Sequence, residues 1–219
     1  MNHIDLPSGC TIPDPSERLA AFCSAEYIYY DAIVSTEPNK IEPIDVLATV
    51  SVNSYVDRAA KVYGVHQGMR AACEPLLPAV PTDAGLLDLN LWRDVVRELL
   101  HASVQVRGVL LPVATKVLHR KRRHLIPMLD NVILEYYFGR DPELRPLLAA
   151  SQDARKAADV GMQALDLFRA DLVATSGTVE SLGEELAAQG FALTAVRILE
   201  ILLWTEVEPR GGYRSVPPD

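Results

Sequence analysis

The segment that decides the fold spans residues 111–137 and reads LPVATKVLHRKRRHLIPMLDNVILEYY. Its first half predicts a helix over about Val113–Arg122. Pro127 then disfavours helical backbone at the preceding residue, Ile126. A second helix is expected to begin after Asp130, whose carboxylate would lie close to the free N–H groups of the first turn. The segment therefore predicts two helices joined by a tight connection.

Helical spacing of apolar residues continues on both sides of this segment. Asp14 and Pro15 are typical of a helix start, with Asp14 as the cap and Glu17 reaching back to it. Further helices are expected over about 44–63, 91–108, 154–172, 178–189 and 191–204. With about seven helices and no alternation of strands and helices, the fold class is all-α, a helical bundle.

The chain contains no low-complexity linker and no repeat of fixed period, so one domain is the economical interpretation. Residues 15–206 are expected to form this single helical domain. Residues 1–14 are expected to be an N-terminal tail. Residues 207–219, rich in Pro and Gly and without periodicity, are expected to be a C-terminal tail.

Three features bear on location. No stretch of roughly twenty apolar residues is present, so no membrane span is expected. The segment Met1–Pro7 has no basic region followed by an apolar one, so no export signal is expected. The cysteines Cys10, Cys23 and Cys73 are odd in number and widely spaced, which favours neither a disulfide framework nor a zinc cage. Together these features favour a cytoplasmic protein.

The charge of the chain bears on its partners. Its net charge of −8 is an electrostatic disadvantage for binding nucleic acid unless a local basic face compensates. The only dense basic run is Arg120-Lys-Arg-Arg-His124. This run is typical of a solvated helix end, where cations complement the negative end of the helix dipole. Alternatively, Arg120, Arg122, Arg123 and His124 bind the phosphates of a nucleic acid or a nucleotide-like molecule.

The segment 111–137 resembles the core of the helix-hairpin-helix DNA glycosylase superfamily. In that superfamily, an aspartate at the start of the helix after the hairpin assists cleavage of the N-glycosidic bond. The stretch Leu125-Ile-Pro-Met-Leu-Asp-Asn-Val132 is similar to the apolar lead into its Asp-x-x-Val element, and residues 41–50 are similar to its early helix. The resemblance covers about the middle third of the chain and implies that Asp130 is the catalytic residue.

The chain departs from the glycosylase pattern in three places. The Gly-x-Gly hairpin that holds a DNA phosphate is replaced near Gly108 by one glycine followed by Val-Leu-Leu-Pro, and the iron–sulfur cysteine signature is absent. Lys116 falls inside the expected helix rather than at its start, where bifunctional glycosylases place their Schiff-base lysine.

A second resemblance covers most of the chain. Lys116-Val-Leu-His119, followed by Ile126-Pro-Met-Leu-Asp130 and by the helix from Arg197 to Trp204, resembles a mainly actinobacterial protein family of uncharacterised function. This resemblance implies an all-helical fold and does not imply an activity.

Asp130 and the tyrosines that follow it have structural as well as functional interpretations. An Asp before a helix caps it, typically contributing about 1 kcal/mol, and this role can coexist with catalysis. Tyr136 and Tyr137 lie about two turns further along the same helix and are candidates for lining a ligand pocket. His119 and His124 are five residues apart, which is not the spacing of a helical metal pair, so no metal site is expected.

Three functions remain open. The first is a degenerate glycosylase-like protein that binds a nucleic acid or nucleoside-like ligand and cleaves an N-glycosidic bond through Asp130. The second is a non-catalytic helical adaptor. The third is an enzyme that reuses the fold for a small metabolite, and the lost hairpin glycines and the negative charge shift the balance towards it. The sequence indicates no cofactor, and it defines neither whether the protein is an enzyme nor its oligomeric state.

Overall fold

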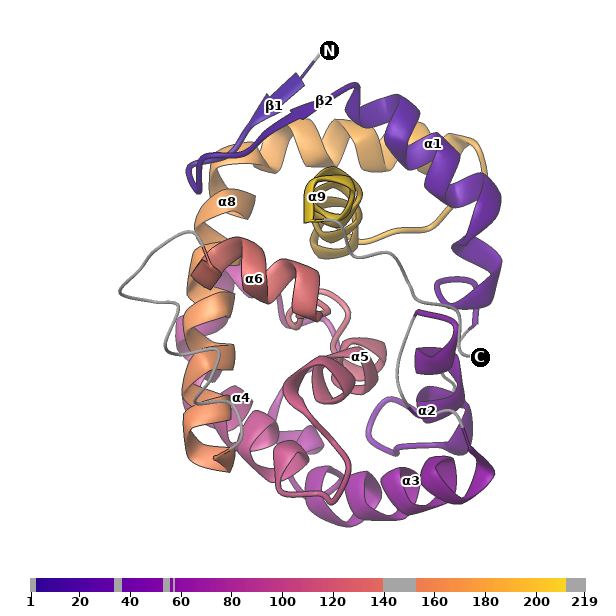
Figure 1. Ribbon diagram of the computed structural model, residues 1–219, viewed down its shortest axis with the longest axis vertical. Helices are drawn as coiled ribbons and strands as arrows, with labels where there is room; N and C mark the ends of the chain where they lie inside the picture. Colours follow the sequence, from indigo (N-terminus) through magenta and orange to yellow (C-terminus); the bar gives the residue numbers. More distant parts are fainter. Residues whose placement is uncertain (1–2, 34–36, 53–55, 57, 140–152, 212–219) are drawn as a thin grey trace.

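The computed structural model describes residues 3–33, 37–52, 56, 58–139 and 153–211 (Figure 1). This part of the chain forms eight α-helices and one two-stranded sheet, which confirms the all-α fold class. None of these helices combines the length and the apolar run that crossing a bilayer takes.

The central element is α5, which lies in the middle of the molecule with the other helices around it (Figure 1). Nine of its eleven residues are buried, so it packs on all sides. The helices are α1 (Pro15–Ala25), α2 (Pro43–Val50), α3 (Ala59–Cys73), α4 (Leu89–Val104), α5 (Leu111–Lys121), α6 (Asn131–Gly139), α8 (Ala154–Ala188) and α9 (Ala195–Gly211). Short 3-10 helices occur at Tyr27–Tyr29, Leu77–Ala79 and Leu86–Asp88.

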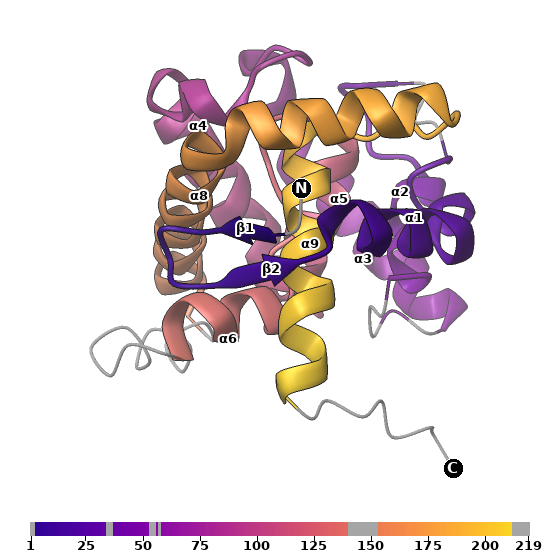
Figure 2. The ribbon, with the colours of Figure 1, turned by 90° about the horizontal axis from the view of Figure 1, so that it is seen from above.

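An N-terminal hairpin lies where the sequence predicts a tail. Strand β1 (His3–Asp5) pairs antiparallel with β2 (Thr11–Pro13), and Ile4 lies opposite Ile12. Both isoleucines are buried in the main core, and β2 contacts α9 (Figure 2). The hairpin is thus part of the packed structure, because its alternate side chains have a core to face.

The helix expected over 44–63 is two helices. Helix α2 ends at Val50, where Ser51 Oγ lies 2.6 Å from the carbonyl oxygen of Ala48 and competes with helical hydrogen bonding. Helix α3 begins at Ala59 and continues through Gly64.

The two helices expected over 154–172 and 178–189 are one helix, α8, which changes direction along its length (Figures 1 and 2). Thr175 Oγ1 donates to the Asp171 carbonyl oxygen at 2.8 Å, a contact that often bends helices. At the other end of the chain, α1 begins at Pro15 as expected. However, Asp14 has a left-handed backbone and makes no side-chain cap.

Candidate acid–base site

The connection between α5 and α6 is buried and held from α5 at two points. His119 Nδ1 donates to the carbonyl oxygen of Ile126 at 2.7 Å, and the backbone N–H of Leu129 donates to Thr115 Oγ1 at 3.0 Å. Burial lowers the pKa of His119 to about 3, so its ring is neutral and Nδ1 carries the proton. These two contacts fix the position of the next residue, Asp130.

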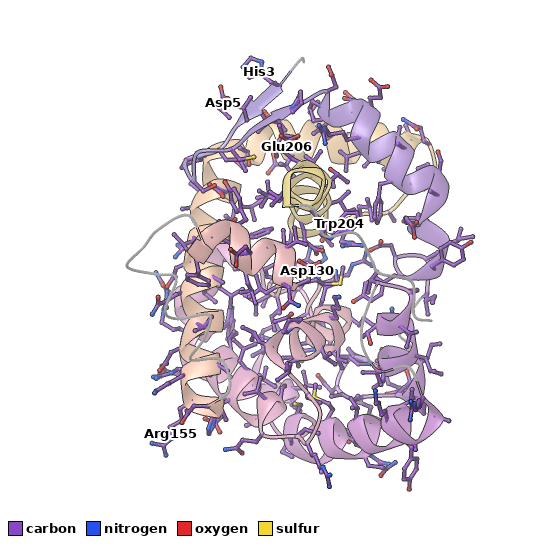
Figure 3. The ribbon with its side chains drawn as sticks, viewed as in Figure 1. His3, Asp5, Asp130, Arg155, Trp204 and Glu206 are labelled. Carbon is purple, nitrogen blue, oxygen red and sulfur yellow. The ribbon has the colours of Figure 1, made fainter. Side chains whose placement is uncertain are left out.

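Asp130 immediately precedes α6, and its side chain is half-buried (Figure 3). Its Oδ1 accepts a hydrogen bond from the backbone N–H of Ile133 at 3.0 Å, so it caps the helix as predicted. Burial raises the pKa of the Asp130 carboxyl, while the capping bond and the charge of Lys116 oppose that rise. The cap is therefore also a carboxyl group with a displaced pKa.

Lys116 is a cation whose charge acts on the carboxyl of Asp130. It is buried on α5, and its Nζ donates to the carbonyl oxygen of Val52. Burial lowers the pKa of Lys116, and the charges of Asp130 and Glu200 counteract this effect. The backbone carbonyl of Lys116 in turn accepts a hydrogen bond from the buried Tyr30 hydroxyl at 2.6 Å. Lys116 thus joins α5 to the segments that carry Tyr30 and Val52.

Arg197 on α9 completes the group. Its Nε and Nη2 bind the two oxygens of Asp31 at 2.9 and 3.0 Å, and its Nη1 donates to Glu200 Oε1 at 2.5 Å. The guanidinium also lies over the rings of Phe22 and Tyr30. Arg197 is therefore a buried cation held between the carboxyl groups of Asp31 and Glu200 and two aromatic rings.

Glu200 has the most unusual carboxyl of the group. Its Oε2 accepts a hydrogen bond from the backbone N–H of Met128 at 3.3 Å. Burial raises the pKa of Glu200 to about 8; Arg197 lowers it, and the charges of Asp130 and Asp31 raise it further. A carboxyl group that keeps its proton near neutral pH can donate that proton to a substrate.

We call Asp31, Lys116, Asp130, Arg197 and Glu200 the Asp130 cluster. It contains three acids and two bases, so at full ionisation the acids exceed the bases by one charge. The charge of Asp130 raises the pKa of Glu200, and burial raises the pKa of both carboxyl groups. Pairs of carboxyl groups with displaced pKa values are one recurring arrangement for acid–base catalysis.

The basic run does not form an exposed patch. Arg122 is fully buried, and all five of its N–H groups have acceptors within the protein. Four acceptors are the carbonyl oxygens of Pro38, Leu77, Val80 and Lys121, and the fifth is Asn39 Oδ1. The hypothesis that Arg122 binds a phosphate is therefore corrected, because it has no donor left for one.

Arg120 is also used within the protein. Its Nε donates to Asp45 Oδ1 at 2.9 Å, and Lys121 Nζ lies 2.5 Å from Asp45 Oδ2. The Arg120 guanidinium further donates to the carbonyl oxygens of Tyr30 and Ile33. These ion pairs join α5 to α2. Arg120 is therefore neither a solvated residue at a helix end nor free to bind a phosphate.

The last two residues of the run reach the surface. Arg123 is partly exposed, donates from Nη2 to the carbonyl oxygen of Ala192 at 3.0 Å, and has no hydrogen-bond acceptor at Nε. His124 is exposed, and partial burial of its ring lowers its pKa. A phosphate contact from this run remains a proposal for Arg123 and His124 only.

Tyr136 and Tyr137 belong to a different buried group. The Tyr137 hydroxyl donates to Asp171 Oδ2 at 2.9 Å, and the Tyr136 hydroxyl is hydrogen-bonded to Ser8 Oγ. Ser8 Oγ and the Ser8 backbone N–H also donate to Asp171, at 2.6 and 3.0 Å. The two tyrosines thus anchor the N-terminal hairpin to α6 and α8, and their hydroxyl groups do not bind Asp130.

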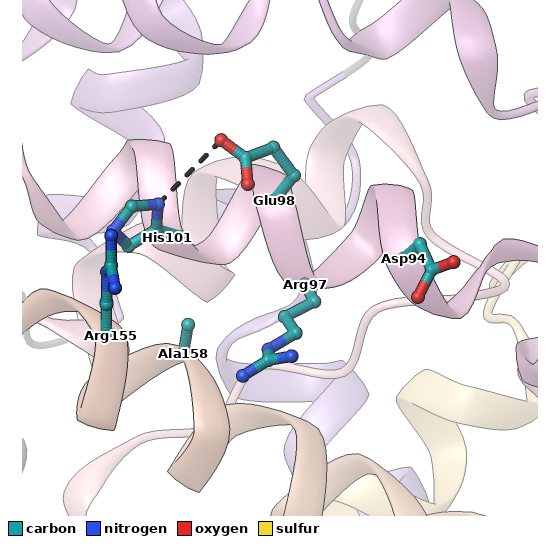
Figure 4. Close-up of a pocket in the computed structure, with 6 residues that line it drawn as sticks. All are labelled: Asp94, Arg97, Glu98, His101, Arg155 and Ala158. Atoms are coloured by element: carbon teal, nitrogen blue, oxygen red, sulfur yellow. Dashed lines mark ion pairs between the residues drawn. The ribbon is translucent and has the colours of Figure 1, made fainter.

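A surface cleft of about 360 Å³ lies between α4 and α8 (Figure 4). Arg97 pairs with Asp159 at 2.5 Å, and Arg93 pairs with Asp166 one turn away. The cleft lies beside these ion pairs between the two helices. Because the pairs are exposed, each contributes little to stability. Its lining residues are Asp94, Arg97, Glu98, His101, Arg155 and Ala158. Over the described ranges, no group of three or more His, Cys, Asp or Glu residues is arranged to hold a metal ion.

Of the Asp130 cluster, only Asp130 itself was a candidate site residue from the sequence. Asp31 and Glu200 come from the segment after α1 and from α9, far along the chain from Asp130. The sequence does carry a signal for Glu200, because Arg197 and Glu200 are isolated charges, three residues apart, in an otherwise apolar helix. Lys116, His119, Asp130 and Arg197, which belong to the quoted pattern, all take part in the site or its support.

The fold and the site define a small all-α protein with a buried, acid-rich cluster of coupled charges. The chain matches a family of unknown function (DUF6308) over residues 18–207 and therefore belongs to that family. No match was found among curated proteins or among solved structures. Membership agrees with the expected uncharacterised family and leaves the activity to be inferred from the site.

Proposed function

We propose that the Asp130 cluster is an acid–base site that cleaves the N-glycosidic bond of a small nucleoside-like molecule. The observation that supports this proposal most is the Glu200 carboxyl, whose pKa burial and the charge of Asp130 raise to about 8. The choice of an N-glycosidic bond rests on the resemblance to glycosylases, in which an aspartate occupies the position of Asp130.

The two carboxyl groups have complementary roles in this reaction. As the bond between the sugar carbon and the base nitrogen breaks, its electron pair goes to the base, and protonated Glu200 transfers its proton to the base. Ionised Asp130 stabilises the positive charge on the sugar and then accepts a proton from the water that adds to the sugar carbon. Lys116 and Arg197 keep the charge on the neighbouring carboxylates balanced.

The contacts of the basic run favour a small substrate over a duplex. Arg120 and Arg122 are engaged within the protein, and the net charge of the chain is −8. A duplex binder depends on several cations that are free to contact phosphates. Arg123 and His124 are surface residues and could contact at most a single phosphate group, such as that of a nucleotide.

The test is base release from a panel of nucleosides, 2′-deoxynucleosides and nucleoside monophosphates, followed by chromatography. Asp130→Asn and Glu200→Gln should each abolish release, whereas Asp94→Asn, which removes a carboxylate lining the cleft between α4 and α8, should leave it unchanged. The absence of base release from every compound would refute the proposal. Fluorescence anisotropy with intact and abasic duplexes across a salt series identifies the nucleic-acid alternative, in which binding falls steeply with log[salt].

A further inference from the structure

The N-terminal hairpin has an open edge along β1. This strand pairs with β2, and β2 in turn contacts α9, so the side of β1 that faces away from β2 is the outer edge of the sheet (Figures 1 and 2). The side chains of His3 and Asp5 lie at the periphery of the molecule (Figure 3), where 58% and 68% of their surfaces are exposed. Another polypeptide can therefore reach this edge from solvent.

The register of the hairpin decides which backbone groups point to this edge. Just after β1, the backbone N–H of Leu6 donates to the carbonyl oxygen of Cys10 at 2.8 Å, in the same register as the two strands. The even-numbered residues of β1 therefore exchange hydrogen bonds with β2, and the residues between them direct their N–H and C=O groups outwards. His3 and Asp5 thus point two N–H and two C=O groups away from β2. Among the described residues, no other backbone or side chain bonds to these four groups.

The open edge of β1 is complementary to itself. When two copies of the strand lie antiparallel about Ile4, His3 of each copy faces Asp5 of the other across a two-fold axis. Each of these two facing pairs exchanges two N–H···O=C bonds, and each imidazole lies opposite a carboxylate on the exposed face of the sheet. Ile4 lies on the axis, where no bond between the copies is required, because its own backbone groups bond to β2.

Shifted registers lose this complementarity. A shift of two residues in one direction places His3 opposite His3, and a shift in the other direction places Asp5 opposite Asp5. Like charges directly opposite each other destabilise a pair of strands. The second shift also brings His3 opposite Pro7, which has no N–H to donate. Charge and backbone bonding therefore favour the same register, the one centred on Ile4.

We propose that two copies of the chain associate through the edge of β1, so that their hairpins form one four-stranded antiparallel sheet. An exposed strand edge is a template for another strand, and a sheet of two strands gains stability when it is extended. Because a strand of three residues buries little surface, the dimer is weak and forms as the protein concentration rises. The interface is separate from the Asp130 cluster and does not depend on the proposed hydrolysis.

The test is sedimentation of the whole protein at low salt over a concentration series from about 5 µM to about 500 µM, the range of weak association. The unmodified protein should pass from monomer to dimer within this series. His3→Pro removes the outward N–H of His3, and with it two of the four bonds between the copies, so it should weaken association at least about tenfold. Thermal denaturation of this variant should match that of the unmodified protein, because the lost N–H does not bond to β2.

Two charge variants test the register. His3→Asp makes both exposed side chains of β1 acidic, and the double variant His3→Lys, Asp5→Lys makes both basic. Each variant alone should remain monomeric, because like charges then lie opposite each other. An equal mixture of the two should form a heterodimer, because opposite charges face each other again. Asp94→Lys, which makes the same acid-to-base change on the surface of α4, is the control and should dimerise as the unmodified protein does.

Three results would overturn the inference. The first is a protein that stays monomeric throughout the series. The second is a dimer that His3→Pro leaves as tight as before, because the copies would then meet at another surface, such as the apolar groove between α2 and α3. The third is a mixture of the two charge variants that does not associate.

Discussion

Two of the buried charged centres in the described part of the chain differ in how completely their hydrogen-bonding groups have partners. At the end of α5, Arg120 and Lys121 share the carboxylate of Asp45, and Arg122 donates all five of its N–H groups to protein acceptors. In the Asp130 cluster, by contrast, acids exceed bases, and the pKa of Glu200 is raised to about 8. In the second centre, burial raises the pKa of the carboxyl groups of Asp130 and Glu200.

The difference separates charges that hold the fold from charges that are suited to chemistry. A buried cation with a complete set of acceptors fixes loops in place and has nothing left to offer a ligand. A carboxyl group whose pKa is displaced by burial and by another acid can change protonation state near neutral pH. We therefore place function at the Asp130 cluster and structure at the end of α5.

The largest expected effect follows from breaking the structural centre. Arg122→Ala removes the donor for five acceptors, four of them backbone carbonyls, and should cost about 3–5 kcal/mol of unfolding free energy or prevent folding. Urea denaturation measures the loss. Arg123→Ala, which removes one hydrogen bond from a partly exposed side chain, should cost less than about 1 kcal/mol. Equal losses in the two variants would contradict the structural role of Arg122.

A smaller effect sharpens the comparison through pH. Glu200 has a pKa of about 8 when folded against 4.5 as a free side chain, so between these values the folded state binds more protons than the unfolded state. Stability from this group is therefore lost as pH rises, with a slope of up to about 1.4 kcal/mol per pH unit. The groups that face Glu200 are Arg197, Asp31, Asp130 and the backbone N–H of Met128.

The variant Glu200→Gln should flatten this decline between pH 5 and pH 8, as followed by urea denaturation at a series of pH values. Asp94→Asn, on the surface of α4, is the control and should keep the slope of the unmodified protein. If the slope in Glu200→Gln equals that of the unmodified protein, the carboxyl of Glu200 does not retain its proton in the folded state.

The smallest effect concerns the cap. Asn is as good an N-cap as Asp, so Asp130→Asn should change the unfolding free energy by less than about 0.5 kcal/mol. Asp130→Ala removes the acceptor for the N–H of Ile133 and should cost about 1 kcal/mol. Thermal or urea denaturation distinguishes the two. A large loss in Asp130→Asn would show that the carboxylate charge serves stability, as the charge of Asp45 does.

The helix pair at the centre of the fold could be predicted from the sequence. Pro127 sets the break, and Asp130 supplies the cap, since both act through neighbours a few residues away. Local signals also placed the start of α1 at Pro15. They did not predict the end of α2 at Val50, because the helical spacing of apolar residues continues past it. They also did not predict the hairpin, because its pairing depends on packing against a core formed by distant parts of the chain.

The candidate site could be predicted only in part, because its members meet through tertiary packing. Asp31 and Arg197 are 166 residues apart, and no local pattern announces their bidentate pair. The charge density of residues 120–124 suggests an exposed run, yet loops bring the carbonyl oxygens of Pro38 and Leu77 onto Arg122. Whether a cation faces solvent or carbonyl oxygens thus depends on where the loops lie, and composition alone does not determine that.

The central claim is that Glu200 is a proton donor near neutral pH. The most direct measurement is NMR titration of protein labelled with ¹³C at the glutamate side-chain carboxyls, with the signal of Glu200 assigned by its disappearance in Glu200→Gln. The account predicts a titration midpoint near pH 8 for Glu200, well above its value of 4.5 as a free side chain. A midpoint near pH 4.5 would contradict it, because Glu200 would then be ionised at neutral pH and could not supply the proton.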